Sequence, residues 1–478
     1  MPSFSTLITL AGLGCNGASQ GDTSSGDGGA VSADSGPADS GTPLGDRLDD
    51  HAFATLVGDR KFGYAGQHVS AAGDFDGDGN SDVLLGAHDD RTGGFGHGAV
   101  YLAAGPFEGD TILSEISTYS VGASGSTDFG ETVAAAGDLN GDGLADVAAT
   151  AARTSSSSST MYIGCGGPIG SFSLESSCGR INPEGYTHVG SGAISPAGDV
   201  NSDGLDDLLV TAIDIDTYGG AAFLFHGPIL GDVDVTDAAW TVTSPHPYEE
   251  LGAAASADGD INGDGARDVA LGAPGGDSFQ QSGGGVYLFH GPLTGSASAT
   301  DADDIWAAEL DGWAVSIYSD LDGDGYDDLV CGVDALGDDQ LTAAAVFYGG
   351  PDGIPLADKS PTAVVLADAD TGRLSFQFSG LGDLDGDGKD ELGLTPRHHV
   401  EDVPSMHVFR GPIEGHVEAD SADWVWYRSY TERKAAFIAP GGDLDGDGRA
   451  DVILGMFDLS IEADMAGGAY LFSGADFL

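Results

Sequence analysis

The stretch GDLDGDGRADVILG, residues 442–455, places four aspartates within nine residues and then continues directly into Val-Ile-Leu. Carboxylates this close repel one another, so the spacing implies that something positive lies among them. A similar stretch occurs seven times, and it begins at Asp74, Asp138, Asp199, Asp260, Asp320, Asp383 and Asp443. The intervals of 64, 61, 61, 60, 63 and 60 residues indicate a repeat architecture.

Each repeat contains four short segments typical of β-strands, separated by turn residues. An alternating small and apolar segment, such as 129–138, leads into the acidic loop, and an apolar run such as 82–87 follows it. An aromatic run ending in Gly-Pro comes next, as in 221–228, and a last segment such as 238–244 ends the repeat. We interpret Gly-Pro as a turn. Four strands in each of seven repeats predict an all-β, seven-bladed β-propeller.

The two ends of the repeat region predict how the ring closes. The last repeat stops at Leu478 without a fourth strand, and a strand-like segment, HAFATLVG (51–58), precedes the first repeat. We expect this N-terminal strand to complete the last blade. Closure of this kind removes the open seam that a chain of blades would otherwise leave.

The nine-residue acidic loops have the residue pattern of a calcium site. Positions 1, 3 and 5 are Asp or Asn, position 6 is Gly, and position 9 is Asp or Glu. Calcium prefers six to eight oxygen ligands at ~2.3–2.6 Å in a flexible cage, and alternate side chains on a tight turn converge on one centre. The varied residue at position 7 is expected to supply its carbonyl oxygen, and the acid at position 9 is expected to close the cage.

The predicted ligands, up to seven Ca²⁺ in all, are described here by loop. Loop one contains Asp74, Asp76, Asp78, Asn80 and Asp82, and loop two contains Asp138, Asn140, Asp142, Leu144 and Asp146. Loop three contains Asp199, Asn201, Asp203, Leu205 and Asp207, and loop four contains Asp260, Asn262, Asp264, Ala266 and Asp268. Loop five contains Asp320, Asp322, Asp324, Tyr326 and Asp328. Loop six contains Asp383, Asp385, Asp387, Lys389 and Glu391, and loop seven contains Asp443, Asp445, Asp447, Arg449 and Asp451.

Two departures and one alternative qualify this pattern. Ser202 stands where the other loops have Gly, and Glu391 replaces Asp at position 9, so loops three and six are expected to differ most. The pattern is not an EF-hand, because position 12 is never an oxygen ligand. Solvated turns are the alternative, since Asp, Asn and Gly favour turns without any metal.

The N-terminal region predicts export. MPSFSTLITLAGLGC has a short apolar core that ends at Cys15, like a bacterial lipoprotein signal, and Cys15 is the predicted lipidation site. Residues 16–45 are rich in Gly, Ser and Asp and are expected to form a disordered linker, with the propeller over 46–478. An exported chain permits a disulfide between Cys165 and Cys178, whereas Cys331 lies in an apolar run and is expected to be a buried thiol.

The composition excludes some partners. The formal net charge of −61 argues against nucleic acid and anionic membrane surfaces, because both require a basic binding surface. No apolar run is long enough to span a membrane, so membrane association is expected only through an N-terminal lipid. We expect a monomer at the bacterial outer membrane surface or in the medium.

The acidic loops and Phe129-Gly130, Leu251-Gly252 and Gly272-Ala273-Pro274 resemble the FG-GAP repeats of integrin α-chain heads and of bacterial surface proteins. The resemblance covers about residues 52–478. It implies a seven-bladed propeller with Ca²⁺ in the hairpin between the first and second strands of a blade. Adhesion to protein or glycan is an expectation by analogy of fold.

Catalytic motifs are absent from the sequence. There is no HExxH, Gly-x-Ser-x-Gly or phosphate-binding loop, and the adjacent His398 and His399 are expected to lie in an exposed loop. The first hypothesis is therefore a non-catalytic, calcium-binding surface propeller that binds extracellular protein or glycan. The alternatives are a secreted hydrolase that uses a propeller face or channel, and a structural spacer at the cell surface.

Overall fold

The computed structural model describes residues 48–478 except 91–96, 122–128, 154–155, 169–176, 185, 215–218, 276–283, 334–342, 355–359, 367–375, 397–405, 428–436, 458 and 460–464. Cys15, the linker over 16–45 and the pair His398-His399 therefore lie outside the described residues. No helix among the described residues is long and apolar enough to cross a membrane.

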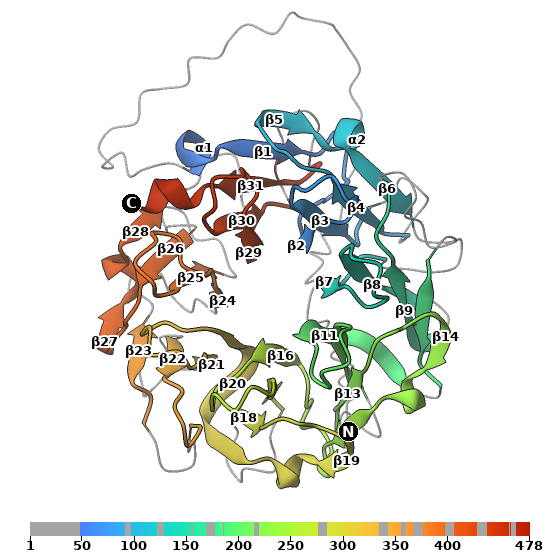
Figure 1. Cartoon of the computed structure of the whole chain (residues 1–478), viewed down its shortest axis with the longest axis vertical. Helices are drawn as coiled ribbons and strands as arrows, with labels where there is room; N and C mark the ends of the chain where they lie inside the picture. The colour runs from blue at the N-terminus through green and yellow to red at the C-terminus, as the bar shows by residue number, and fades with distance from the viewer. Residues whose placement is uncertain are drawn as a thin grey trace, which may run out of the picture.

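Seven blades of antiparallel strands surround a central axis, with the first strand of each blade innermost, and blades four and five are continuous through one long strand (Figure 1). Blade one contains β2 (His68–Gly73), β3 (Asp82–Ala87), β4 (Ala99–Ala103) and β6 (Ser117–Val121). Blade two contains β7 (Val133–Gly137), β8 (Asp146–Arg153), β9 (Ser156–Gly164) and β10 (Gly179–Asn182). Blade three contains β11 (Thr187–Gly198), β12 (Asp207–Asp214), β13 (Ala221–Phe225) and β15 (Trp240–Thr243).

The remaining blades follow the same order. Blade four contains β16 (Ala254–Gly259), β17 (Asp268–Ala273), β18 (Gly284–Phe289) and the start of β20 (Asp304–Ser319). Blade five contains the end of β20, then β21 (Asp328–Val333), β22 (Ala343–Phe347) and β23 (Ala363–Leu366). Blade six contains β24 (Phe376–Gly380), β25 (Glu391–Pro396), β26 (Met406–Arg410) and β28 (Trp424–Trp426). Blade seven contains β29 (Phe437–Gly442), β30 (Asp451–Gly455), β31 (Gly468–Phe472) and β1 (Ala54–Val57). The predicted propeller is confirmed.

The core of the protein lies between the blades. Seven clusters of buried apolar residues occur among the described residues, and each cluster combines side chains from two neighbouring blades. Leu84 of blade one and Phe129 of blade two share one cluster, for example, and Leu85 and Leu471 join blade one to blade seven. Each sheet therefore buries both faces, which explains the apolar runs Val83-Leu84-Leu85 and Val452-Ile453-Leu454.

The N-terminal strand closes the ring as predicted. β1 pairs antiparallel with β31, with Ala54 opposite Leu471 and Val57 opposite Gly468. Its four residues are buried. The helix α1 (Leu48–His51) precedes it, and Leu48 packs into the cluster between blades six and seven. The start of the chain thus supplies the outer strand of the last blade.

A fifth, short strand in four blades was not predicted. After the aromatic strand the chain forms β5 (Gly109–Ile112), β14 (Gly231–Asp234), β19 (Gly295–Ser298) and β27 (Gly415–Glu418). Each pairs in parallel with the outer strand of the preceding blade, that is with β1, β10, β15 and β23. The short helix α2 (Leu113–Ile116) and the 3₁₀ turns η2 (Val235–Asp237), η3 (Ala299–Asp301) and η5 (Ala419–Ser421) follow these strands, and η6 (Gly474–Phe477) follows β31. Backbone pairing therefore continues from one blade to the next.

The Phe-Gly motif also lies at a blade junction. Phe129 is fully buried, and Gly130 has a φ of 81°. A Cβ on Gly130 would lie 2.3 Å from the carbonyl oxygen of Ala99 in blade one, so a side chain is sterically excluded there. The motif allows the entry to one blade to lie directly against the third strand of the blade before it.

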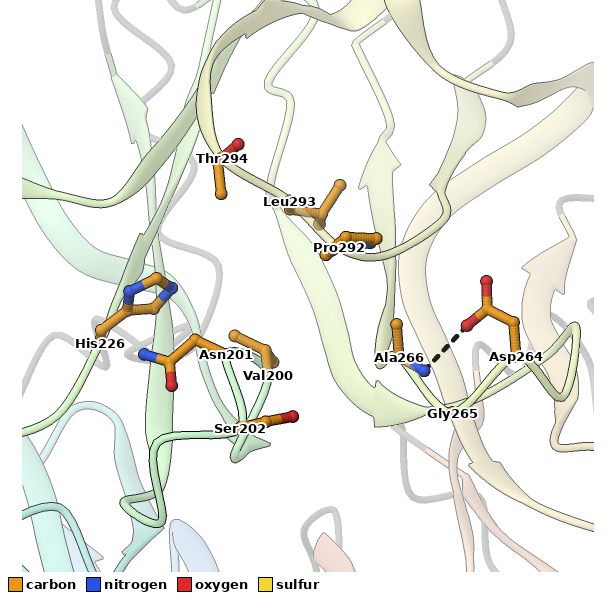
Figure 2. A pocket seen from close by; sticks show the side chains of 10 residues that line it. All are labelled: Val200, Asn201, Ser202, His226, Asp264, Gly265, Ala266, Pro292, Leu293 and Thr294. Carbon is orange, nitrogen blue, oxygen red and sulfur yellow. Dashed lines mark hydrogen bonds between the residues drawn. The ribbon is translucent and has the colours of Figure 1, made fainter.

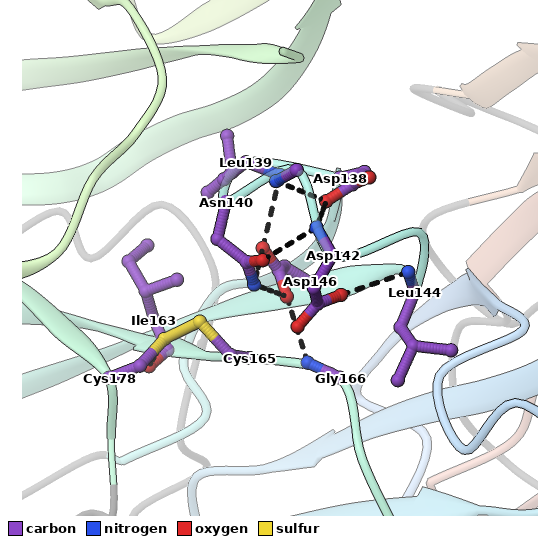
Figure 3. Close-up of a disulfide and its surroundings, with 11 residues drawn as sticks. Asp138, Leu139, Asn140, Asp142, Leu144, Asp146, Ile163, Cys165, Gly166 and Cys178 are labelled. Atoms are coloured by element: carbon purple, nitrogen blue, oxygen red, sulfur yellow. Dashed lines mark hydrogen bonds between the residues drawn. A yellow bond between two sulfur atoms is a disulfide. The ribbon is translucent and has the colours of Figure 1, made fainter.

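The disulfide between Cys165 and Cys178 joins the third strand of blade two to the segment that leads into its fourth (Figure 3). The Cα atoms of the pair are 5.7 Å apart. Cys331 is a buried thiol, as expected from its apolar surroundings, and its Sγ lies 3.9 Å from the carbonyl oxygen of Ala345.

We predict that Leu56→Ala weakens the closure of the ring. Leu56 is fully buried in the cluster between blades seven and one, so truncation should lower the free energy of unfolding by about 2–5 kcal/mol in a denaturant titration. The matched control is Leu230→Ala, because the Leu230 side chain is 50% exposed and its loss should change stability little. Equal effects of the two substitutions would contradict a structural role for the N-terminal strand.

Candidate metal centres

All seven acidic loops connect the innermost strand of a blade to the second strand, as the resemblance implied. In four loops, three carboxylates each offer an oxygen within 4.8 Å of the others. These clusters are Asp74, Asp76 and Asp78; Asp320, Asp322 and Asp328; Asp383, Asp385 and Glu391; and Asp443, Asp445 and Asp451. Loops two, three and four have Asn at position 3, which supplies a neutral oxygen in place of a carboxylate.

The side chains at positions 1, 3 and 5 turn inward and accept hydrogen bonds from amides of their own loop. In every loop the amide of the position-6 glycine donates to the position-1 carboxylate, as from Gly79 to Asp74. The amides of positions 5 and 7 donate to the side chains at positions 3 and 5. All these bonds are 2.8–3.1 Å long. Asp78 Oδ1, Asp138 Oδ1 and Asp320 Oδ1 each accept two hydrogen bonds, and the oxygens that accept a single bond keep a lone pair that can bind a cation.

The turn also needs a left-handed backbone at two positions. The position-6 glycines have φ values of 86–93°, which a side chain would oppose. Position 4 is likewise left-handed, and in loop three Ser202 adopts a φ of 61° there. Loop three therefore differs from the others, as predicted, by the strained backbone of Ser202, and it keeps the same loop shape.

The acid at position 9 is buried in every loop and joins three parts of the blade. One of its oxygens accepts the amide of position 2 at 2.6–3.0 Å. In six blades the other oxygen accepts a glycine amide from the turn after the third strand, as Asp146 does from Gly166 at 2.8 Å (Figure 3). The Gly-Pro segment is a turn, as predicted. Its glycine donates this bond in blades one, three and four, whereas the donor is the residue before Gly-Pro in blades two and five and is Gly474, with no proline after it, in blade seven.

Loop six is the exception, and the reason is the longer side chain of Glu391. Its Oε2 accepts the amide of Leu384 at 2.7 Å, but its Oε1 is buried with no hydrogen-bond partner. Glu391 is fully buried, and Asp383 and Asp385 lie in the same cluster. A buried carboxylate oxygen without a donor is costly unless a cation or a proton compensates for it. The residues of loop six therefore fit a bound cation.

The side chains at position 2 point away from the proposed cation, as do several at position 7, whereas Asn80 of loop one donates through Nδ2 to Asp78 Oδ1 at 2.8 Å. Position 2 is apolar in every loop and belongs to the core between blades, as Phe75 and Leu139 do. A position-7 side chain packs on position 4 of the preceding loop, as Tyr326 does on Gly263 and Lys389 on Gly323. This orientation agrees with the expectation that position 7 offers its carbonyl oxygen.

Two loops have a basic side chain beside their acids. The Nδ1 atom of His290 is 3.1 Å from Asp268 Oδ2 in loop four, and this contact raises the pKa of His290. The Nε atom of Arg410 is 2.7 Å from Asp385 Oδ2 in loop six, and its guanidinium lies over the Trp424 ring. Both residues immediately precede Gly-Pro. They offset part of the negative charge in these two loops.

Burial raises the pKa of the position-9 acids of loops one, two, three, five, six and seven in the protein without metal. Desolvation raises the pKa of Asp82, Asp146 and Asp451 from 3.8 to about 6, although backbone amides oppose the shift. The same cause raises the pKa of Asp328 and Glu391 to about 8. Charge without a compensating cation is therefore costly at these positions.

A shallow hollow of about 390 Å³ lies between loops three and four (Figure 2). Its lining residues are Val200, Asn201, Ser202, His226, Asp264, Gly265, Ala266, Pro292, Leu293 and Thr294. Asp264 is the single carboxylate among them, so this hollow does not present the acid pair that glycosidase chemistry uses.

Sequence reasoning missed two groups of residues that shape the loops. A glycine in the turn after the third strand supports six of the loops, and the recurrence of glycine about 20 residues after each loop is the signal that could have indicated it. The apolar residue at position 2 was also overlooked, although it is Phe, Leu, Val or Ile in every loop.

We predict that Glu391→Asp stabilises the protein in calcium-free buffer. The shorter side chain should restore the bond to the glycine amide before Pro412 that the other six blades have, a gain of about 1 kcal/mol in the free energy of unfolding. The matched control is Asp451→Glu in loop seven, which should lose the bond from Gly474 and be destabilised by a similar amount. Shifts of the same sign in the two variants would contradict the geometry described above.

We predict that the calcium-free protein loses stability as the pH rises from about 4 to about 8. The folded state retains protons on Asp328, Glu391 and Asp451 to a higher pH than the unfolded state does, so unfolding releases protons in this range and becomes easier as the pH increases. The melting temperature should therefore be lower at pH 8 than at pH 5.5. Calcium should reduce this difference, because the cation takes the place of the proton. A higher melting temperature at pH 8 without calcium would contradict the prediction.

Comparisons with known proteins agree with this architecture. Residues 129–159 and 251–289 match the FG-GAP repeat family model, and these ranges begin at Phe129 and Leu251 of the predicted motif. Human integrin alpha-X is 34% identical over 165 residues, which cover 30% of this chain and 13% of that protein. Integrin alpha-5 of Xenopus laevis is 32% identical over 150 residues, 28% of this chain and 14% of that protein.

One relative has the name of an enzyme. Human phosphatidylinositol-glycan-specific phospholipase D is 32% identical over 183 residues, which cover 35% of this chain and 21% of that protein. The chain thus spans only a small part of each of these relatives, and the activity of a whole relative does not transfer with the match. The chain is thus a seven-bladed β-propeller that matches the FG-GAP repeat model in two segments and is similar, over part of its length, to the integrin alpha chains.

Proposed function

We propose that this protein is a calcium-stabilised β-propeller at the cell surface that binds an extracellular protein or glycan and catalyses no reaction. The observation that carries the calcium part is the set of four loops in which three carboxylate oxygens lie within 4.8 Å of one another. The similarity to integrin alpha chains supports the binding part.

The side chains at positions 1, 3, 5 and 9 would hold the cation, together with the carbonyl of position 7. Calcium suits this donor set because it accepts six or more oxygens in a flexible cage, whereas Mg²⁺ retains more water and Zn²⁺ prefers His or Cys. The bound cation would compensate for the negative charge of the buried acids at position 9. These acids connect the hairpin of the first two strands of a blade to the rest of that blade. Its role in this proposal is structural.

The proposal includes an exported location. Lipid on Cys15 and a flexible tether over 16–45 would hold the propeller away from the membrane as a monomer. The net charge of −61 fits a surface exposed to a salty medium and disfavours nucleic acid. The name phospholipase D belongs to a relative of which only 21% is matched, so hydrolysis is not part of the proposal.

We expect removal of calcium to lower the melting temperature. A ligand that binds only the folded state stabilises it by about 2.7 kcal/mol per site at a hundredfold excess over its Kd, so several occupied loops should produce a large shift. Thermal unfolding with excess calcium should be compared with unfolding after dialysis against EDTA, with magnesium as the control cation. An unchanged melting temperature without calcium would contradict the proposal.

The binding partner can be sought with an array of glycans and extracellular proteins, probed with and without calcium. Specific binding that requires calcium would support the proposal. A variant with Asp322→Ala and Asp445→Ala removes one predicted cation ligand from each of loops five and seven. If circular dichroism shows that this variant remains folded in calcium, its binding to the partner tells whether these loops or another face of the propeller form the binding surface. Absence of binding in both conditions would leave the spacer hypothesis as the better account.

A further inference from the structure

Position 8 of three loops contains an aspartate that the calcium pattern does not use. These residues are Asp206 in loop three, Asp327 in loop five and Asp390 in loop six. Each precedes the buried acid of its own loop, but its side chain contacts the loop before it. The contact is the same at all three places, so the fold creates it repeatedly.

Each of these aspartates forms two hydrogen bonds with position 1 of the preceding loop. The amide of Asp260 donates to Asp327 Oδ2 at 2.7 Å, and the amide of Asp327 donates to the carbonyl of Asp260 at 3.2 Å. The corresponding distances are 2.7 and 3.1 Å between Asp138 and Asp206. They are 3.1 and 3.0 Å between Asp320 and Asp390.

The other junctions provide a comparison within the same molecule. At the junction of loops one and two, Ala145 keeps the backbone bond to the Asp74 carbonyl at 3.1 Å but has no carboxylate. Position 8 is Ser81 in loop one, Arg267 in loop four and Ala450 in loop seven, none of which has a carboxylate. The paired bonds therefore join loops two and three, and loops four, five and six.

We propose that Asp206, Asp327 and Asp390 are positioning residues that couple the cation sites of adjacent loops. Position 1 is the first predicted ligand of its loop, and position 8 is adjacent to the last predicted ligand of the next loop. A cation that orders loop five therefore also fixes Asp327, which holds the backbone of Asp260 in loop four. The second cation then meets a loop that is already ordered, and this gives positive cooperativity. The inference rests on the proposed cation binding.

Tyr326 provides a local probe of the coupled pair formed by loops four and five. It occupies position 7 of loop five and packs on Gly263 of loop four, and it is the single Tyr or Trp in the seven nine-residue loops. Excited tyrosine transfers energy to Tb³⁺, an ion that replaces Ca²⁺ at oxygen sites. The difference in terbium emission between the unmodified protein and Tyr326→Phe therefore measures the occupancy of loops four and five in the full-length protein.

The test compares Asp327→Ala with Asp327→Asn in terbium titrations of the calcium-free protein. The first variant removes the acceptor for the Asp260 amide, whereas the second removes the same charge but retains an oxygen acceptor. We expect a Hill coefficient above one in the unmodified protein and in Asp327→Asn. In Asp327→Ala the coefficient should fall to about one and the midpoint should rise on the order of fivefold. Ser81→Ala, at a junction without a carboxylate, should change nothing.

Circular dichroism shows whether each variant is folded. If Asp327→Ala does not fold, Asp390→Ala, which frees loop five from loop six, should raise the midpoint of the Tyr326-dependent emission in its place. A titration of the alanine variant like that of the unmodified protein would overturn the coupling while leaving cation binding intact. Equal losses in the alanine and asparagine variants would show that charge alone acts, and would overturn it too. If the unmodified protein shows no Tyr326-dependent emission, the proposed cation binding fails, and the coupling fails with it.

Discussion

The buried carboxylate at position 9 of each acidic loop is the interaction on which the blade depends. In six blades it joins three parts, as Asp146 does in blade two. Its oxygens accept amides from the start of the loop and from the turn after the third strand, and its own backbone begins the second strand. Burial makes the ionised form costly, and this cost raises the pKa of Asp328 and Glu391 to about 8. A nearby cation would remove the cost. The stability of each blade therefore depends on whether a cation or a proton compensates for the buried acid of its loop.

The ring adds a second level of organisation. No blade has a core of its own, since every apolar cluster in the described part of the chain combines side chains of two neighbours. The extra parallel strands cross the junctions of blades seven and one, two and three, three and four, and five and six. The aspartate bonds between loops cross those of blades two and three, four and five, and five and six. A change in the conformation of one loop can therefore alter the conformation of the loop in the neighbouring blade through these backbone hydrogen bonds. For a protein with a net charge of −61, such contacts also fix where the acidic groups lie relative to one another.

Much of this structure could be predicted from the repeated pattern. The period near 60 residues, the four strand-like runs and the spare segment at 51–58 gave the seven blades and their closure correctly, because each follows from local alternation and turn chemistry. The extra strands β5, β14, β19 and β27 were missed, since a four-residue segment shows no period and pairs only with a distant blade. The Glu391 oxygen without a hydrogen-bond partner was missed too. The extra methylene of Glu relative to Asp prevents this bond only because of where the donor amide lies, and the sequence does not contain that position.

The sequence by itself determined the number of blades, the places of the acidic loops and the residue types that face a cation, because these depend on spacing along one chain. The tertiary structure decided which oxygens already accept hydrogen bonds, which acids are desolvated and which loops contact each other. Asp327 illustrates the difference: in the sequence it is one more acid beside Asp328, whereas in the folded ring it accepts the amide of Asp260, 67 positions earlier. Only the packing of adjacent blades brings position 8 of one loop against position 1 of the loop before it, and no local pattern contains that distance.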